Sequence, residues 1–151
     1  MASIATQLET FNGSSHRLLL FAVAGTVYGC DIGAVREIVP IRHATRLPGA
    51  ATYVRGLINL RGAIVTVIDL AARLAGSSAA PEGSVVLAEY GSKQVGLAVD
   101  EVRDVQILSS DQFEVATGDV ARGGIVHGLG HLDDGVVIVL DVPAVVRQVM
   151  S

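Results

Sequence analysis

An internal repeat constrains the fold of this chain more than any other feature of its sequence. Sliding the chain by 67 positions aligns residues 18–41 with 85–108, and sliding it by 72 aligns 54–70 with 126–142. The two matches keep the same order, and the difference of five positions indicates an insertion between Ser109 and Gly124. Valine-rich strands align with one another by composition alone, but two ordered matches are harder to explain in that way. Two similar units of about seventy residues are therefore predicted.

The most regular part of the first unit is the stretch from Val54 to Leu70. Two apolar, β-branched runs flank Arg61-Gly62, a pattern that predicts a β-hairpin with its tip at the glycine. The runs do not alternate strictly, which predicts strands that are buried on both faces.

Several shorter segments also have patterns that predict secondary structure. Residues 18–23 and 27–32 are predicted strands, and Ala24-Gly25 is the predicted turn between them. Apolar residues three and four apart predict a helical turn over Gly33–Val39. Two further short helices are predicted, one over Leu70–Leu74, ended by Gly76, and one over Val142–Met150.

The units are predicted to belong to one domain. Residues 1–15 read as a flexible tail and 16–151 as a single domain, divided into a first unit (about 16–76), a linker (77–84) and a second unit (85–151). A unit of this size buries too little surface to be stable alone, so the two should pack side by side, and strands could cross between them. Short strands between Gly and Pro turns favour small barrels.

Composition excludes several classes of protein. The formal net charge is −4 and no basic run is present, which disfavours a nucleic-acid partner. The single cysteine cannot form an intramolecular disulfide, so a reducing compartment is expected. No apolar run is long enough to span a bilayer and no secretory signal is evident, so a cytoplasmic location without membrane insertion is predicted.

No catalytic motif is evident. The chain has neither a phosphate-binding loop ending in Gly-Lys-Ser/Thr nor a Gly-x-Ser-x-Gly turn. Cys30 lies in an apolar run and is read as a buried structural thiol. His127 and His131 have a spacing that suits metal ligands on a helix, but the Gly-rich segment around them is more typical of strand and loop. Asp69 and Asp141 occupy matching positions and are read as structural residues, either caps or turn formers.

Arg61 invites two interpretations. It is either a solvated charge at a hairpin tip or a residue kept for a partner or a local ion pair. The matching position of the second unit is Asp133, so the fold does not require an arginine there.

Three motifs, in order, resemble the CheW family of bacterial chemotaxis coupling proteins. They are Tyr28–Ile32 followed by Val35–Val39, Val54–Gly62 running on to Val67–Leu70, and Val95–Val102. The resemblance extends from Leu18 to about Val146. It implies an all-β fold of two five-stranded SH3-like barrels packed side by side, with short helices.

The resemblance also implies a function without catalysis, cofactor or metal. Members bridge the cytoplasmic tip of a chemoreceptor and the regulatory domain of a histidine kinase, and reach membrane receptor arrays through these partners. The alternative is a related regulatory domain that competes for and inhibits the kinase, or that serves a pilus or other chemosensory pathway. If the family's receptor-contact residues are carried over to the matching motifs of this chain, the receptor-binding groove would contain Ile32, Val35, Glu37, Ile38, Gly56, Arg61, Val102 and Val105. Val35 and Ile38 have their repeat counterparts in Val102 and Val105, so two apolar patches would form a groove suited to a helix.

Overall fold

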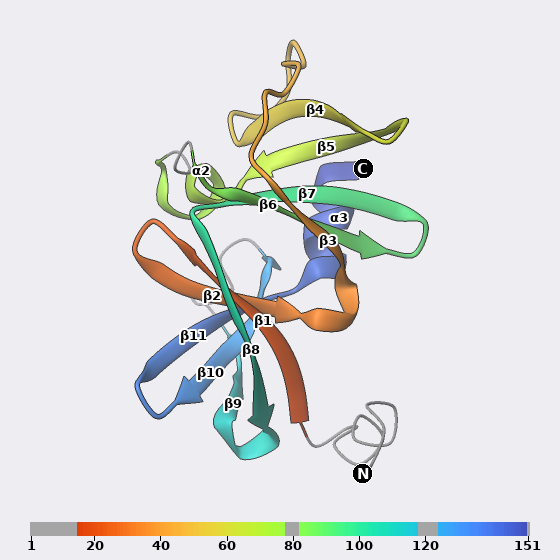
Figure 1. Cartoon of the computed structure of the whole chain (residues 1–151). Helices are drawn as coiled ribbons and strands as arrows, with labels where there is room; N and C mark the ends of the chain where they lie inside the picture. The colour runs from red at the N-terminus through yellow and green to blue at the C-terminus, as the bar shows by residue number, and fades with distance from the viewer. Residues whose placement is uncertain (1–14, 78–81, 118–123, 151) are drawn as a thin grey trace.

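The computed structural model describes residues 15–77, 82–117 and 124–150. The predicted tail falls almost entirely on residues 1–14, outside the described part, as does the middle of the predicted linker. The described chain is all-β, with two sheets side by side and short helices at their junction (Figure 1). The predicted pair of SH3-like barrels is confirmed.

The first sheet has the strand order β8-β1-β2-β11-β10-β9. Its strands are β1 (Ser15–Val23), β2 (Thr26–Asp31), β8 (Glu101–Ser109), β9 (Phe113–Val115), β10 (Val126–Leu132) and β11 (Gly135–Leu140). Five strands were expected, and the sixth is the three-residue β9, which lies in the longer connection of the second repeat.

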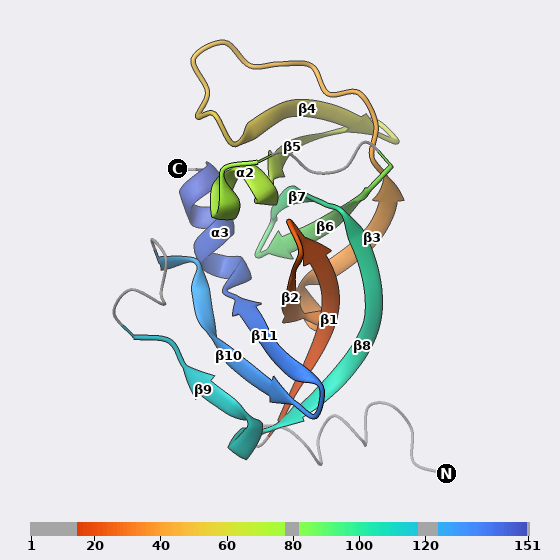
Figure 2. The same cartoon turned by 90° about the vertical axis from the view of Figure 1, so that its left-hand side faces the viewer.

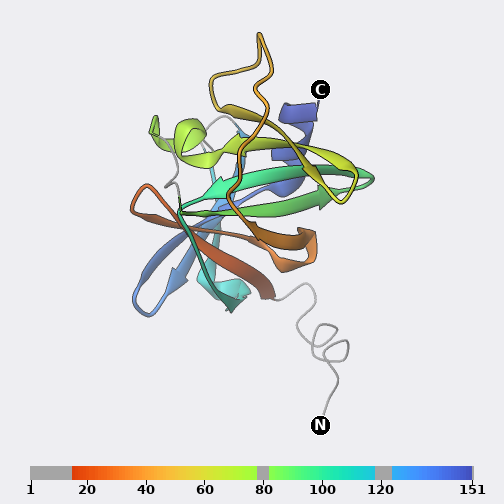
Figure 3. The same ribbon diagram turned by 45° about the horizontal axis from the view of Figure 1, so that its top comes forward.

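The second sheet has the strand order β3-β6-β7-β5-β4. Its strands are β3 (Val35–Pro40), β4 (Val54–Leu60), β5 (Ala63–Asp69), β6 (Ser84–Tyr90) and β7 (Lys93–Val99). The long connection between β3 and β4 extends beyond the β4–β5 hairpin (Figure 3). It carries one bridge, between Thr45 and Leu57, at the place that β9 occupies in the other sheet.

The repeat accounts for both strand orders. The offsets of the repeat place β1, β2 and β3 on β6, β7 and β8, and place β4 and β5 on β10 and β11. Under this substitution the five shared strands have the same order in both sheets. Each sheet, however, takes its first hairpin from one repeat and its other strands from the other repeat. The sheets are therefore not the two sequential halves of the chain.

One apolar cluster joins the sheets, and we call it the shared core. It contains residues from strands of both sheets, among them Phe21, Cys30, Val86 and Leu97. Two helices complete it, α2 (Leu70–Ala75) and α3 (Val142–Met150), and both lie at the junction of the sheets in Figure 2. Each sheet also encloses a smaller cluster of its own. The burial of the shared core thus depends on both repeats at once.

The central hairpin has the predicted tip. Arg61 and Gly62 have φ angles of 50° and 88°, so both turn residues are left-handed, as a tight two-residue hairpin requires. The expectation of burial on both faces is wrong for most of the hairpin, because Asn59 and Ile64, which pair with each other, both face solvent. Only the end of β5, from Val67 to Asp69, is buried without alternation.

The predicted helical turn over Gly33–Val39 is also wrong in large part. A 3-10 helix, η1, covers only Ile32–Ala34, and the chain continues as β3. The two other predicted helices form where expected. Gly76 ends α2 with a φ angle of 71°, a left-handed conformation that glycine adopts without steric cost.

Candidate protein-binding surface

Val35 and Ile38 face the shared core from the edge strand β3. Val35 pairs with Ala88 and Ile38 pairs with Val86 on the neighbouring β6. Both partners belong to the shared core. Because residues directly opposite each other in a sheet point to the same face, Val35 and Ile38 lie on that face too. Residues on the same face of a strand are normally two positions apart in the sequence. Val35 and Ile38 are three positions apart because Arg36 is inserted as an extra residue, which forms a β-bulge. In the sequence, this three-residue spacing predicts the helical turn over Gly33–Val39 instead.

The counterpart strand β8 repeats this arrangement in the other sheet. Val102 pairs with Phe21 and Val105 pairs with Leu19, and both partners again belong to the shared core. The register between these pairs shifts by one residue, so β8 is bulged at the place equivalent to Arg36. The strands β3 and β8 lie on the same side of the molecule, toward the viewer in Figure 1 and at the right in Figure 2.

This face of the two strands extends from the core into solvent. Val35 and Val102 pack against the shared core, whereas Ile38 and Val105 expose 43% and 44% of their surface. Ile107, two residues beyond Val105 and 49% exposed, extends the same face of β8. We call these five residues the apolar strip. Ile107 was missed in the sequence because its repeat counterpart is Pro40, although the alternation along β8 points to it.

The structure brings Glu37 and Arg61 together. Glu37 lies on β3 and Arg61 at the tip of the β4–β5 hairpin, and the guanidinium of Arg61 forms an ion pair with the carboxylate of Glu37. The Arg61 side chain is 75% exposed and that of Glu37 is 25% exposed. The local ion pair that the sequence left open is therefore present, and the guanidinium still reaches solvent.

Two other predicted residues are less accessible. Ile32 lies in η1 and packs against the shared core. Gly56 is buried, and a β-carbon at this position would lie 2.1 Å from the carbonyl oxygen of Thr45. The close approach of Thr45 and the φ angle of 138° both require glycine here. Its first role is thus to admit the bridge between Thr45 and Leu57.

The remaining chemically distinctive residues have structural roles. Cys30 is fully buried, and burial together with the charge of Asp31 raises the pKa of its thiol from 9.0 to about 12. Asp69 accepts a hydrogen bond from the backbone N–H of Ala72, as Asp141 does from Ala144, so both cap a helix, which is one of the two predicted roles.

Neither a metal cluster nor a membrane-spanning helix is found among the described residues. His127 and His131 lie on strand β10, and His131 is 3.3 Å from a carboxylate oxygen of Glu114. Residues 15–77, 82–117 and 124–150 contain no group of three His, Cys, Asp or Glu side chains that could hold a metal ion. No helix in these ranges has the length and apolar character needed to cross a membrane.

The comparisons with known proteins agree with the fold and the motifs. A family model described as "CheW-like domain" matches residues 17–150.

The chain belongs to the CheW-like domain family.

Two relatives and one solved structure illustrate the range of the CheW-like family around this chain. The chemotaxis protein CheW of Klebsiella aerogenes is 31% identical over 147 residues, which cover 94% of this chain and 89% of that protein. Protein PilI of Pseudomonas aeruginosa is 30% identical over 116 residues, covering 74% and 65%. The crystal structure of the scaffolding protein TtCheW from Thermoanaerobacter tengcongensis matches with a TM-score of 0.77 at 28% identity, covering 83% and 88%. The chain is thus a CheW-type chemotaxis scaffold in fold and family.

Proposed function

We propose that this protein is a non-catalytic cytoplasmic adaptor that couples the cytoplasmic tip of a chemoreceptor to the regulatory domain of a histidine kinase. The receptor binds along the apolar strip, next to the Glu37–Arg61 ion pair. The partners recruit the protein to membrane receptor arrays. Membership of the CheW-like family and similarity to a scaffolding protein support this proposal.

One structural observation supports the proposed function in particular. The apolar strip is built from two strands that the repeat relates to each other, and in both strands a bulge turns two valine or isoleucine side chains toward the same face. The strip begins in the shared core and ends in solvent, so binding a helix buries apolar surface without unfolding any strand. The charged pair at Arg61 adds a polar, directional contact at the edge of this surface.

Reconstitution of receptor, kinase and this protein tests the proposal. A coupling protein raises receptor-controlled kinase activity, and Ile38→Ser combined with Val105→Ser should remove most of this increase. Ile64→Ser is the matched control, because Ile64 is 63% exposed but lies on the β4–β5 hairpin, outside the apolar strip. A fall in kinase activity on adding the wild-type protein would instead identify a competing regulatory domain. Equal effects of the double variant and the control would remove the apolar strip from the binding site.

A further inference from the structure

Strand β8 carries three of the five residues of the apolar strip and is the outermost strand of its sheet. In the described part of the chain its side-chain pairs run along β8 itself, from Arg103 to Glu101 and from Gln106 to Asp104, both at 3.1 Å. The two ion pairs of β3 reach β6 and the β4–β5 hairpin instead. Backbone hydrogen bonds form equally well in more than one register, so the register of β8 depends on other contacts. The contacts that tie β8 to other strands lie at its two ends.

The last residue of β8, Ser109, is held by Gln112, which ends the 3-10 helix η2 (Ser110–Gln112). Ser109 pairs with Ser15 of β1, and its backbone N–H donates to Oε1 of Gln112 at 3.0 Å. The Nε2 of Gln112 donates in turn to the carbonyl oxygen of His131, on β10, at 3.2 Å. This end of β8 is thus attached to both β1 and β10.

Asp100, the residue directly before β8, holds the other end. Its backbone N–H donates to the carbonyl oxygen of Ala22 at 3.0 Å, and its carboxylate accepts from the N–H of Ala24 at 2.8 Å. Ala24 has a φ angle of 50°, a left-handed conformation that costs energy in any residue with a β-carbon. Asp100 therefore attaches the start of β8 to the strained turn between β1 and β2.

Between these two attached ends β8 is one residue longer than the part of β1 that it faces. Ser109 pairs with Ser15 at one end, and Glu101 pairs with Ala22 at the other. Because both ends are held, the extra residue must be accommodated within the ladder as a bulge.

The bulge decides which side chains of β8 face the shared core. If the start of β8 slid by one residue, the bulge would disappear and Arg103 would replace Val102 opposite Phe21. Val102 would then point to the other face of the sheet, while Val105 would keep its place.

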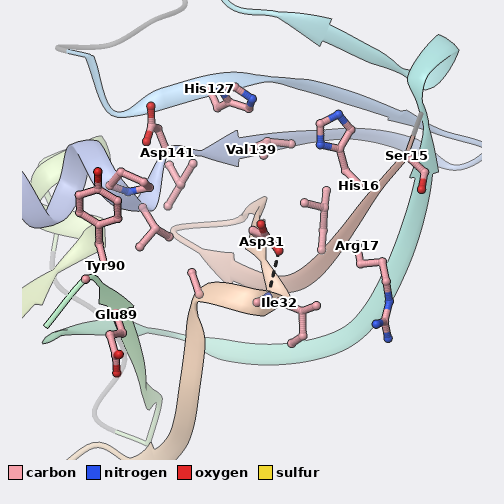
Figure 4. A pocket seen from close by; sticks show the side chains of 17 residues that line it. Ser15, His16, Arg17, Asp31, Ile32, Glu89, Tyr90, His127, Val139 and Asp141 are labelled. Atoms are coloured by element: carbon pink, nitrogen blue, oxygen red, sulfur yellow. Dashed lines mark hydrogen bonds between the residues drawn. The ribbon is translucent and has the colours of Figure 1, made fainter. Parts of the chain in front are cut away.

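We propose that Asp100 is a positioning residue, which by holding the start of β8 forces the bulge and keeps Val102 on the same face as Val105. This inference rests on the proposed function of the apolar strip, and Asp100 acts without touching the partner. The repeat does not copy the arrangement, because the offset of 67 puts Gly33 at the position of Asp100. There the carboxylate of Asp31 accepts from the N–H of Gly33 at 2.9 Å, a bond within one short turn (dashed line in Figure 4).

The test compares two variants of Asp100 in the full chain. Asp100→Ala removes the acceptor for the N–H of Ala24, whereas Asp100→Asn keeps an acceptor oxygen. In the reconstituted activation assay, the concentration of this protein that gives half-maximal activation should rise by about tenfold for Asp100→Ala and stay within about twofold for Asp100→Asn. A wild-type value for Asp100→Ala overturns the proposal.

A double variant separates positioning from a loss of stability. Ala24→Gly removes the steric cost of the left-handed turn, so Asp100→Ala combined with Ala24→Gly should regain stability in urea unfolding. The half-maximal concentration should stay raised, and its recovery together with stability would show that Asp100 only stabilises the turn. Asp141→Ala is the matched control, because it removes a carboxylate that accepts from a backbone N–H of α3, outside the apolar strip. An equal rise in this control also overturns the proposal.

Nuclear magnetic resonance measures the register of β8 without any receptor. Backbone nuclear Overhauser effects should connect Phe21 with Val102 in the wild type and in Asp100→Ain the Asn variant, but Phe21 with Arg103 in Asp100→Ala. An unchanged pattern in Asp100→Ala contradicts the positioning role, and the double variant is measured if the single one does not fold. A changed pattern together with a wild-type protein that fails to activate the kinase would uphold the positioning role and reject the proposed function.

Discussion

The guanidinium of Arg61 and the carboxylate of Glu37 join the two ends of one sheet. Glu37 lies on β3 and Arg61 follows β4, and these are the outermost strands in the order β3-β6-β7-β5-β4. The ion pair therefore crosses the seam at which the sheet closes on itself. Because both groups are partly exposed, solvent weakens their attraction.

Arg61→Ala should separate stability from function. We expect the free energy of unfolding to fall by less than about 1 kcal/mol, the range of exposed ion pairs and surface substitutions. Receptor-coupled kinase activation should be largely lost, because alanine cannot replace a planar, multi-donor contact. Urea unfolding and the reconstituted activation assay measure the two effects. Full activation by the folded variant would remove Arg61 from the site.

Exchanging the two charges distinguishes a local role from a direct contact. The double variant Glu37→Arg, Arg61→Glu keeps an ion pair across the seam, so its stability should return to within about 0.5 kcal/mol of wild type. Activation should stay low, because the guanidinium has moved from the hairpin tip to β3. Recovery of activation together with stability would show that activation requires the ion pair itself and not a guanidinium at the hairpin tip.

Gly56→Ala should be far more destabilising than Gly62→Ala. At Gly56 the new β-carbon would lie 2.1 Å from the carbonyl oxygen of Thr45, so the backbone must move. We expect a loss above about 3 kcal/mol, the upper end of ordinary single substitutions. At Gly62 nothing lies within 4 Å, and only the left-handed conformation costs about 1–2 kcal/mol. Urea unfolding of both variants gives the comparison. Similar losses would contradict the steric argument.

Stability should fall at high pH because of Cys30. Burial raises the pKa of its thiol to about 12, whereas in the unfolded chain it remains near 9.0. Between these values the unfolded state has lost a proton that the folded state retains, so rising pH favours unfolding by up to about 1.4 kcal/mol per pH unit. Below pH 9 this contribution vanishes. Cys30→Ala should show a smaller slope in unfolding measurements between pH 9 and 11, and equal slopes would contradict the assignment.

The two sheets should unfold in a single transition. Each sheet contains strands of both repeats, and the shared core spans both sheets, so neither sheet can lose its structure alone. Tryptophans introduced separately at Tyr90, on β6, and at Phe113, on β9, report on different sheets. Their thermal transitions should coincide. Two well-separated transitions would show that the sheets are independent.

Sequence comparison of the repeat predicted two similar units and allowed strands to cross between them, but it did not predict which strands pair. The repeat offsets align each strand with its counterpart because similar residues occur at equivalent positions of both copies. Pairing partners depend on contacts between distant segments, and nothing in the local pattern distinguishes pairing of β1 with β8 from pairing with β3.

The residues of the candidate binding surface were predictable only where the family motifs contain them. Val35 and Ile38 share one face of β3, and Val102 and Val105 share one face of β8, but periodicity alone predicts a helix for the first pair. A bulge produces a three-residue spacing within a strand, so the two conformations give the same local pattern.

The exchange of strands has a consequence for the ancestry of such chains. Every pairing between the repeats has a counterpart with the repeats interchanged: β1 with β8 corresponds to β6 with β3, and β2 with β11 corresponds to β7 with β5. Two identical half-length polypeptides could therefore form both sheets as a symmetric dimer, using only pairings that already exist here. Duplication and fusion of such a gene would require no new strand contact. It would free each copy to diverge at single positions such as Arg61 and Asp133.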